Sequence, residues 1–170
     1  LIKSIYLPSI RSQTPKPFIN ALNSFAPAIY LTEELYNDFL NSGNIILGMS
    51  GGEGWGLPEF QSTALGKHAV ILDGPGYQDW ANESNAVMVK PNGKEEAADG
   101  VFFNKGGAFN QGSIFTFNED EFIAGCEQAV DRYKSSPINQ EGLKLQDEFT
   151  YEKTMHSITN IIETKGDDNA

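Results

Sequence analysis

The chain has 170 residues, 39% of them hydrophobic, and carries a formal net charge of −11 at pH 7. This length suits one globular domain, and the excess negative charge argues against nucleic acid and anionic membrane surfaces as partners. No apolar run approaches the roughly 20 residues of a membrane helix, and no signal peptide is visible, so no membrane span is expected. The single Cys126 excludes an intrachain disulfide, which favours a reducing compartment, and we predict the cytoplasm.

The first quarter of the chain is predicted to alternate between strands and helices. The expected elements are a strand at 2–7, a turn-rich connection at 8–17, a short helix at 18–22 and a strand at 28–31. Thr32 is then a good N-cap, and Glu33 in the first turn complements the helix dipole. Apolar residues at helical spacing follow, so the sequence predicts a helix that ends before Gly43.

The stretch from Gly48 to Gly66 carries the strongest local signals. Apolar strands are expected on either side of it, at 45–47 and 69–72. Pro58 stands where a first helical turn should begin, and Gly66 where that helix should stop. The pattern predicts strand, glycine-rich loop, short helix and strand, which is one βαβ unit with parallel strands. Such a unit presents its loop and helix N-terminus beyond the carboxyl ends of the strands.

The second half of the chain continues the alternation with one gap in the pattern. We expect a loop at 73–80, a strand at 86–89 closed by a turn at 91–93, an ordered excursion without a clear period at 94–117, helices starting at Asn118, Gln140 and Thr150, and an acidic disordered tail at 166–170. Asn118 and Glu121 have the spacing of a capping box. The fold class predicted is a single Rossmann-like, three-layer α/β domain over residues 1–165, with a mainly parallel sheet covered on both faces.

The glycine-rich loop favours a bound anion. Glycines let backbone N–H groups approach a ligand closely, and a helix N-terminus offers free N–H groups with a partial positive charge. The alternative is a plain tight turn. The loop differs from the G-x-x-x-x-G-K-[ST] phosphate loop because no Lys-Ser or Lys-Thr ends it, and from G-x-G-x-x-G because G-E-G-W-G-L-P lacks the third glycine.

The stretch S-G-G-E-G-W-G-L-P-E-F-Q-S-T-A-L-G-K-H-A-V-I-L-D resembles the donor-binding signature of retaining glycosyltransferases with two Rossmann-like domains, the GT-B type of the group-one glycosyl transferases. The loop D-G-P-G-Y-Q-D-W and the later F-T-Y-E-K-T are also similar to that family. The resemblance is strong over 44–91, good over 118–162 and weak before residue 31. It implies that this chain is the C-terminal, donor-binding half of a GT-B fold.

The resemblance also assigns site residues. Glu53 would be the catalytic-site acid that contacts the donor sugar, and the donor loop would comprise Gly51, Gly52, Gly54, Trp55, Gly56 and Leu57. Arg11 and Lys16 have the family's spacing for holding the donor diphosphate, although two basic residues in a loop are usually solvated. The family's ribose-binding glutamate is replaced by Gln61, which lowers the expected affinity by about tenfold. Glu59 is expected to complement the helix dipole, with ribose binding as the alternative.

No metal site is predicted, because two histidines and one cysteine cannot form a cluster. The acids at 119–121 are expected at a helix N-terminus, where they complement the dipole. Asp73 and Asp79 are equally well explained as site residues at a strand end and as ordinary loop acids. The resemblance implies metal-independent sugar transfer with retention from a nucleotide-diphosphate sugar, with no cofactor. It also implies an N-terminal acceptor domain that is missing here, so we expect a fragment or a subunit that needs a partner. The alternative is a non-catalytic α/β binding or interaction module.

Overall fold

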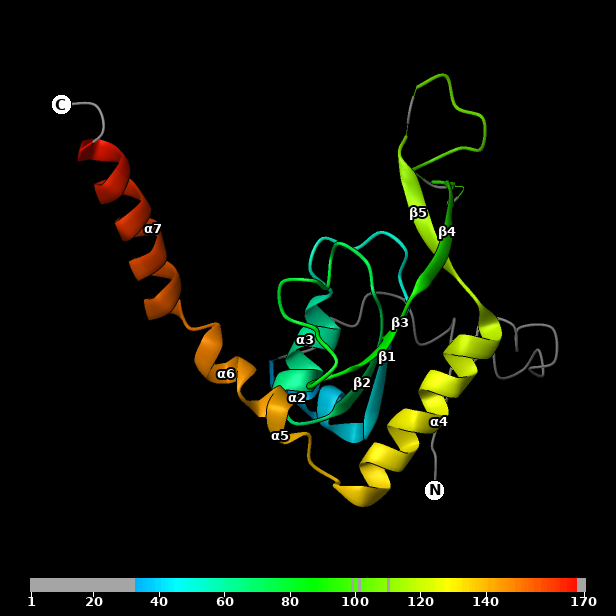
Figure 1. Cartoon of the computed structure of the whole chain (residues 1–170), viewed down its shortest axis with the longest axis horizontal. Helices are drawn as coiled ribbons and strands as arrows, with labels where there is room; N and C mark the ends of the chain where they lie inside the picture. The colour runs from blue at the N-terminus through cyan, green and yellow to red at the C-terminus, as the bar shows by residue number, and fades with distance from the viewer. Residues whose placement is uncertain (1–32, 99, 101, 110, 168–170) are drawn as a thin grey trace. The chain divides into compact units, whose positions relative to one another are not determined.

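The computed structural model describes residues 33–98, 100, 102–109 and 111–167 (Figure 1). The elements predicted at 2–7, 18–22 and 28–31, and the predicted site residues Arg11 and Lys16, lie outside these described residues. The chain divides into two units, residues 1–43 and 44–170. In the first unit, helix α2 spans Glu33–Ser42, which confirms the helix predicted to end before Gly43.

The second unit carries the remaining strands and helices. In chain order they are β1 (Ile45–Gly48), α3 (Leu57–Ala64), β2 (His68–Leu72), β3 (Val87–Val89), β4 (Pro91–Glu96), β5 (Ser113–Phe117), α4 (Glu119–Ser135), α5 (Gln140–Leu143), α6 (Leu145–Glu148) and α7 (Tyr151–Asp167). The fold is therefore mixed α/β, as predicted.

The predicted βαβ unit is confirmed. Strands β1, β2 and β3 form a parallel sheet in that order, with Ile46 opposite Ala69 and Ile71 opposite Met88. Helix α3 connects β1 to β2, because parallel neighbours need a crossover rather than a tight turn. Gly66 closes this helix with a φ of 80°, a conformation that favours glycine, as its position in the sequence predicted.

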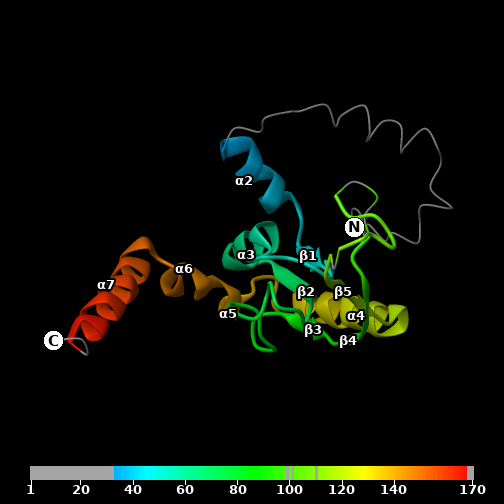
Figure 2. The same ribbon diagram turned by 90° about the horizontal axis from the view of Figure 1, so that it is seen from above.

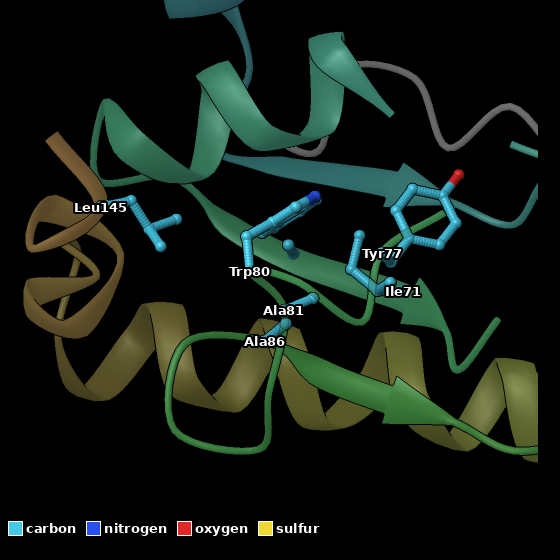
Figure 3. Packing of buried hydrophobic residues seen from close by; sticks show 7 residues of the cluster. Ile71, Tyr77, Trp80, Ala81, Ala86 and Leu145 are labelled. Atoms are coloured by element: carbon cyan, nitrogen blue, oxygen red, sulfur yellow. The ribbon is translucent and has the colours of Figure 1, made fainter. Parts of the chain in front are cut away.

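Helices cover both faces of this small sheet. Figures 2 and 3 show α3 on one side of β2 and α4 on the other. Ala69 and Ile71 of β2 belong to the core cluster on the α3 side. Val70 faces α4, where a Cβ added to Gly125 would lie 3.3 Å from Val70 Cγ1. Every residue of β2 is buried, which explains why the four residues after His68 are apolar without alternation.

The core on the α3 side is built around aromatic rings. Trp80 and Tyr77, both almost fully buried, come from the loop between β2 and β3 and lie between the sheet and α3 (Figure 3). The Phe60 ring of α3 meets the Trp80 ring edge-on, with ring centroids 5.6 Å apart. Phe149 closes the cluster, 5.2 Å from Phe60. Edge-on aromatic pairs of this kind add stability beyond the apolar area that they bury.

The stretch after β3 differs from the sequence prediction. The turn expected at 91–93 is wrong, because Pro91 begins strand β4, which pairs antiparallel with β5 to form a hairpin. The ladder has an irregularity between Pro91 and Gly93. Proline is tolerated at the start of a strand or at such a bulge. The excursion predicted at 94–117 is therefore the rest of this hairpin and the long connection at its end.

The C-terminal helices agree with the predictions except at one break. Asn118 caps α4 as expected, since its Oδ1 accepts hydrogen bonds from the Asp120 and Glu121 N–H groups at 2.8 and 3.2 Å. The helix expected from Gln140 is divided at Lys144, whose N–H donates to the Glu141 carbonyl three residues earlier instead of four. Helix α7 extends two residues into the predicted tail.

None of the helices in the described part of the chain is long and apolar enough to cross a membrane.

Candidate ligand-binding site at the glycine-rich loop

The candidate site lies at the carboxyl edge of the parallel sheet. The loop of residues 49–56 leaves β1 there, and the loop of residues 73–86 leaves β2. The two loops are in backbone contact, because a Cβ at Gly76 would overlap the Glu53 carbonyl. The hairpin joins them, since the Phe115 N–H donates to the Gly51 carbonyl at 2.9 Å. Three segments distant in sequence therefore meet at the glycine-rich loop.

The four loop glycines do not have the same surroundings. A Cβ at Gly51 would overlap the Phe115 carbonyl, and one at Gly56 would overlap the Tyr77 ring. A Cβ at Gly52 would lie 3.3 Å from a methyl group of Ile114, whereas one at Gly54 would meet nothing within 4 Å. Packing within the protein thus explains why positions 51 and 56 need glycine. Gly54 is the loop glycine whose backbone faces open space.

Helix α3 begins without a side-chain cap. Its N-cap residue is Gly56, with a φ of 71° and a ψ of 57°, which provides no side-chain cap. Pro58 lies in that turn as predicted. An uncapped N-terminus leaves N–H groups that suit an anion. This end of α3 follows Gly54 by two residues, and the binding of an anion there stays a prediction.

The side chains predicted to form the donor loop differ in their surroundings. Glu53 and Leu57 are exposed at the surface, where they can meet a ligand. The Trp55 ring instead packs 5.7 Å from Phe60 and 5.4 Å from Phe149, and its carbonyl accepts a hydrogen bond from Trp80 Nε1 at 2.9 Å. Trp55 therefore holds the loop to the core. The remaining predicted residue, Gln61, is half-buried on α3.

Tyr77 lies at the candidate site and was not predicted from the sequence. Its ring fills the space beside Gly56, and it is only 1% exposed. Figure 3 shows the ring beside the carboxyl end of β1. Burial raises the pKa of the phenol well above its ordinary value, and the charges of Glu59 and Glu53 add to that shift. The Ser50 N–H partly opposes this shift.

Glu59 lies in the first turn of α3, half-buried beside the same loop. A Cβ at Gly48 would lie 2.8 Å from Glu59 Cγ, so this side chain passes over the end of β1. Burial raises the pKa of the Glu59 carboxyl, the Glu53 charge adds to the effect, and the N–H of Glu59 itself opposes it. The dipole role predicted for Glu59 is therefore offset by desolvation.

The raised pKa gives a testable dependence of stability on pH. A glutamate whose pKa is higher in the folded state than in the unfolded state stabilises the fold at low pH and loses that contribution as the carboxyl ionises. Glu59→Gln should therefore match the wild type near pH 4 and have the higher melting temperature at pH 7. Glu127→Gln, a change at an exposed position of α4, is the control. A wild type that gains stability relative to Glu59→Gln as the pH rises would contradict the assignment.

The hairpin places a cation near the loop. Lys94 Nζ lies 4.4 Å from the centroid of the Phe115 ring, and the Phe115 backbone is bonded to Gly51. Lys94 was not predicted as a site residue, because residues 94–117 show no clear helical or strand period. Tyr77 was not predicted either, because a tyrosine that follows two loop glycines carries no signal of burial.

No group of three or more histidine, cysteine, aspartate or glutamate residues in the described ranges is arranged to hold a metal ion. Comparison with known families and proteins does not add an assignment: no protein-family model matches the chain, and no curated protein matches it.

Proposed function

We propose that residues 44–170 are the donor-binding half of a glycosyltransferase, a Rossmann-like domain of the GT-B type that binds a nucleotide-diphosphate sugar and takes part in sugar transfer with retention, without a metal. The observation that carries the proposal is the β1–loop–α3–β2 unit. It presents an uncapped helix N-terminus, the open backbone at Gly54 and the exposed carboxylate of Glu53 together at one edge of a parallel sheet.

The groups of this loop suit the two ends of such a donor. Phosphate oxygens match the partial positive charge at the N-terminus of α3. Sugar hydroxyls match Glu53, because an ionised carboxylate accepts strong hydrogen bonds. Lys94 lies on the neighbouring hairpin and adds a cation for the phosphates. The acceptor would be bound by a separate N-terminal domain across the site, and the lone Cys126 supports the cytoplasm as the compartment.

Titration calorimetry against a panel of nucleoside diphosphates and their sugar conjugates tests this proposal. We expect saturable binding by the wild type. Glu53→Ala should weaken binding of the sugar conjugate by about tenfold to a hundredfold, because it removes a charged hydrogen-bond acceptor. Glu127→Ala makes the same change of charge at an exposed position of α4 and should bind as the wild type does. If no member of the panel gives saturable heat with the wild type, the proposal fails.

A second function is favoured by how tightly the loop is packed. Protein atoms occupy the space beside Gly51 and Gly56, and the Trp55 ring packs against the core. Gln61 stands where the resembled family has its ribose-binding glutamate. These features suit a non-catalytic module that keeps the fold and binds a nucleotide, a sugar or another protein. Sugar transfer that is lost in Glu53→Ala would exclude this second function.

A further inference from the structure

The Tyr77 hydroxyl is a buried polar group without a partner. Among the described residues, it is the buried side-chain oxygen or nitrogen atom that makes no hydrogen bond. Such a group is unfavourable in a folded protein, and native structures usually satisfy it with protein, water or a ligand. The position of this hydroxyl at the candidate site makes a ligand the partner to consider.

The hydroxyl lies at the base of the glycine-rich loop. A Cβ at Gly48 would lie 3.4 Å from the Tyr77 hydroxyl oxygen and 2.8 Å from Glu59 Cγ. The same tyrosine ring lies against Gly56, the N-cap of α3. The phenol is therefore next to both the last residue of β1 and the first turn of α3, at the edge where Glu53 is exposed.

The charges around the phenol select the kind of ligand group. The negative charges of Glu59 and Glu53 both act on Tyr77. A phosphate placed against the phenol would be repelled by both carboxylates. A neutral hydroxylated group satisfies all three side chains, because its hydroxyls donate to carboxylates and accept from a phenol. A sugar ring, with hydroxyls on neighbouring carbons, provides such donors and acceptors.

We propose that Tyr77 and Glu59 bind the sugar ring of the ligand, with the Tyr77 hydroxyl donating to a sugar oxygen and the Glu59 carboxylate accepting from a sugar hydroxyl. This inference rests on the proposed function and adds two residues to its site. The proposal requires the half-exposed Glu59 side chain, which lies with the phenol beside Gly48, to move so that the ligand reaches the Tyr77 hydroxyl. Both residues act on the sugar and not on the nucleotide.

The test compares Tyr77→Phe with the wild type by titration calorimetry, using a nucleoside diphosphate, its sugar conjugate and the free monosaccharide as probes. We expect Tyr77→Phe to bind the sugar conjugate about five- to tenfold more weakly, as for one lost hydrogen bond, and the bare nucleoside diphosphate equally well. Glu59→Gln should show the same selective loss. Without ligand, Tyr77→Phe should have a melting temperature at or above that of the wild type, because it removes an unpaired buried hydroxyl.

Tyr133→Phe is the matched control. The Tyr133 ring lies 6.3 Å from the His68 ring, at the amino end of β2 and away from the loop, so this variant should bind all three probes as the wild type does. If the wild type binds nucleoside diphosphates but Tyr77→Phe keeps the full gain in affinity from the sugar, only this inference fails. A lower melting temperature for Tyr77→Phe also overturns it, since the hydroxyl would then have a partner within the protein. If the wild type binds none of the probes, both this inference and the proposed function fail.

Discussion

Asn139→Asp should destabilise the protein by about 3 kcal/mol or more, although the two side chains have the same size. Asn139 is 6% exposed and lies between three parts of the fold. Its Nδ2 donates to the Lys67 carbonyl at 3.1 Å and to the Asn85 carbonyl at 2.7 Å, and its Oδ1 accepts from the Gly142 N–H at 3.0 Å. Aspartate keeps the acceptor but places an oxygen against two buried carbonyls, which removes two hydrogen bonds and adds repulsion.

Asn118→Asp is the control for this prediction. Asn118 is exposed at the start of α4 and only accepts hydrogen bonds there, from Asp120 and Glu121. Aspartate is an equally good N-cap, so the free energy of unfolding should change by less than about 0.5 kcal/mol. Urea denaturation of both variants measures the difference. Equal midpoints for Asn139→Asp and the wild type would show that the hydrogen bonds from the Asn139 amide to the Lys67 and Asn85 carbonyls do not stabilise the fold.

The hydrogen bonds of Asn139 to distant residues could not be predicted from local sequence patterns. Local signals predicted the parallel unit around the loop, because a buried strand, a glycine cluster, Pro58 and Gly66 act on their own neighbours. They also predicted the cap at Asn118. Asn139 caps α5 in the same way, through its Oδ1, but its Nδ2 bonds join residues 54 and 72 positions away in the chain. Spacing within a short window carries no information about such partners.

The hairpin was missed for a related reason. Strand β4 has the sequence P-N-G-K-E-E, in which proline, asparagine and glycine are typical of a turn, and most of its residues are exposed. Its strand conformation depends on pairing with β5, whose Phe115 also bonds to the loop at Gly51. Tertiary context of this kind overrides weak strand propensity. The consequence for the site is direct, because that hairpin places Lys94 over the ring of Phe115, whose backbone bonds to the loop.

The glycine-rich loop was predicted as a ligand cradle, and the structure divides its glycines into two classes. Gly56 combines a left-handed backbone with contact to a core ring, whereas Gly54 has neither constraint. The sequence pattern alone treats both residues alike. A pair of alanine substitutions at these two positions therefore separates a packing role from a role at an open surface.

Gly56→Ala should destabilise the protein by about 3 kcal/mol. The left-handed conformation at a φ of 71° costs a non-glycine residue roughly 1–2 kcal/mol. The new Cβ would also overlap Cε1 of Tyr77, and Tyr77 cannot move freely because it is 1% exposed and part of the core cluster. Overpacking a well-packed core of this kind costs a further amount of about 1–3 kcal/mol. Urea denaturation gives the loss as a lower midpoint at an unchanged slope.

Gly54→Ala is the companion variant, and it should change stability by less than about 0.5 kcal/mol, because its Cβ would meet nothing within 4 Å. The new methyl group would instead project where the ligand is proposed to lie. We therefore expect this variant to remain folded and to bind a nucleoside diphosphate more weakly than the wild type in the same titration. Equal destabilisation by both substitutions would contradict the division of the loop into a packed part and an open part. A stable Gly56→Ala protein would show that the Tyr77 ring is not fixed against the start of α3.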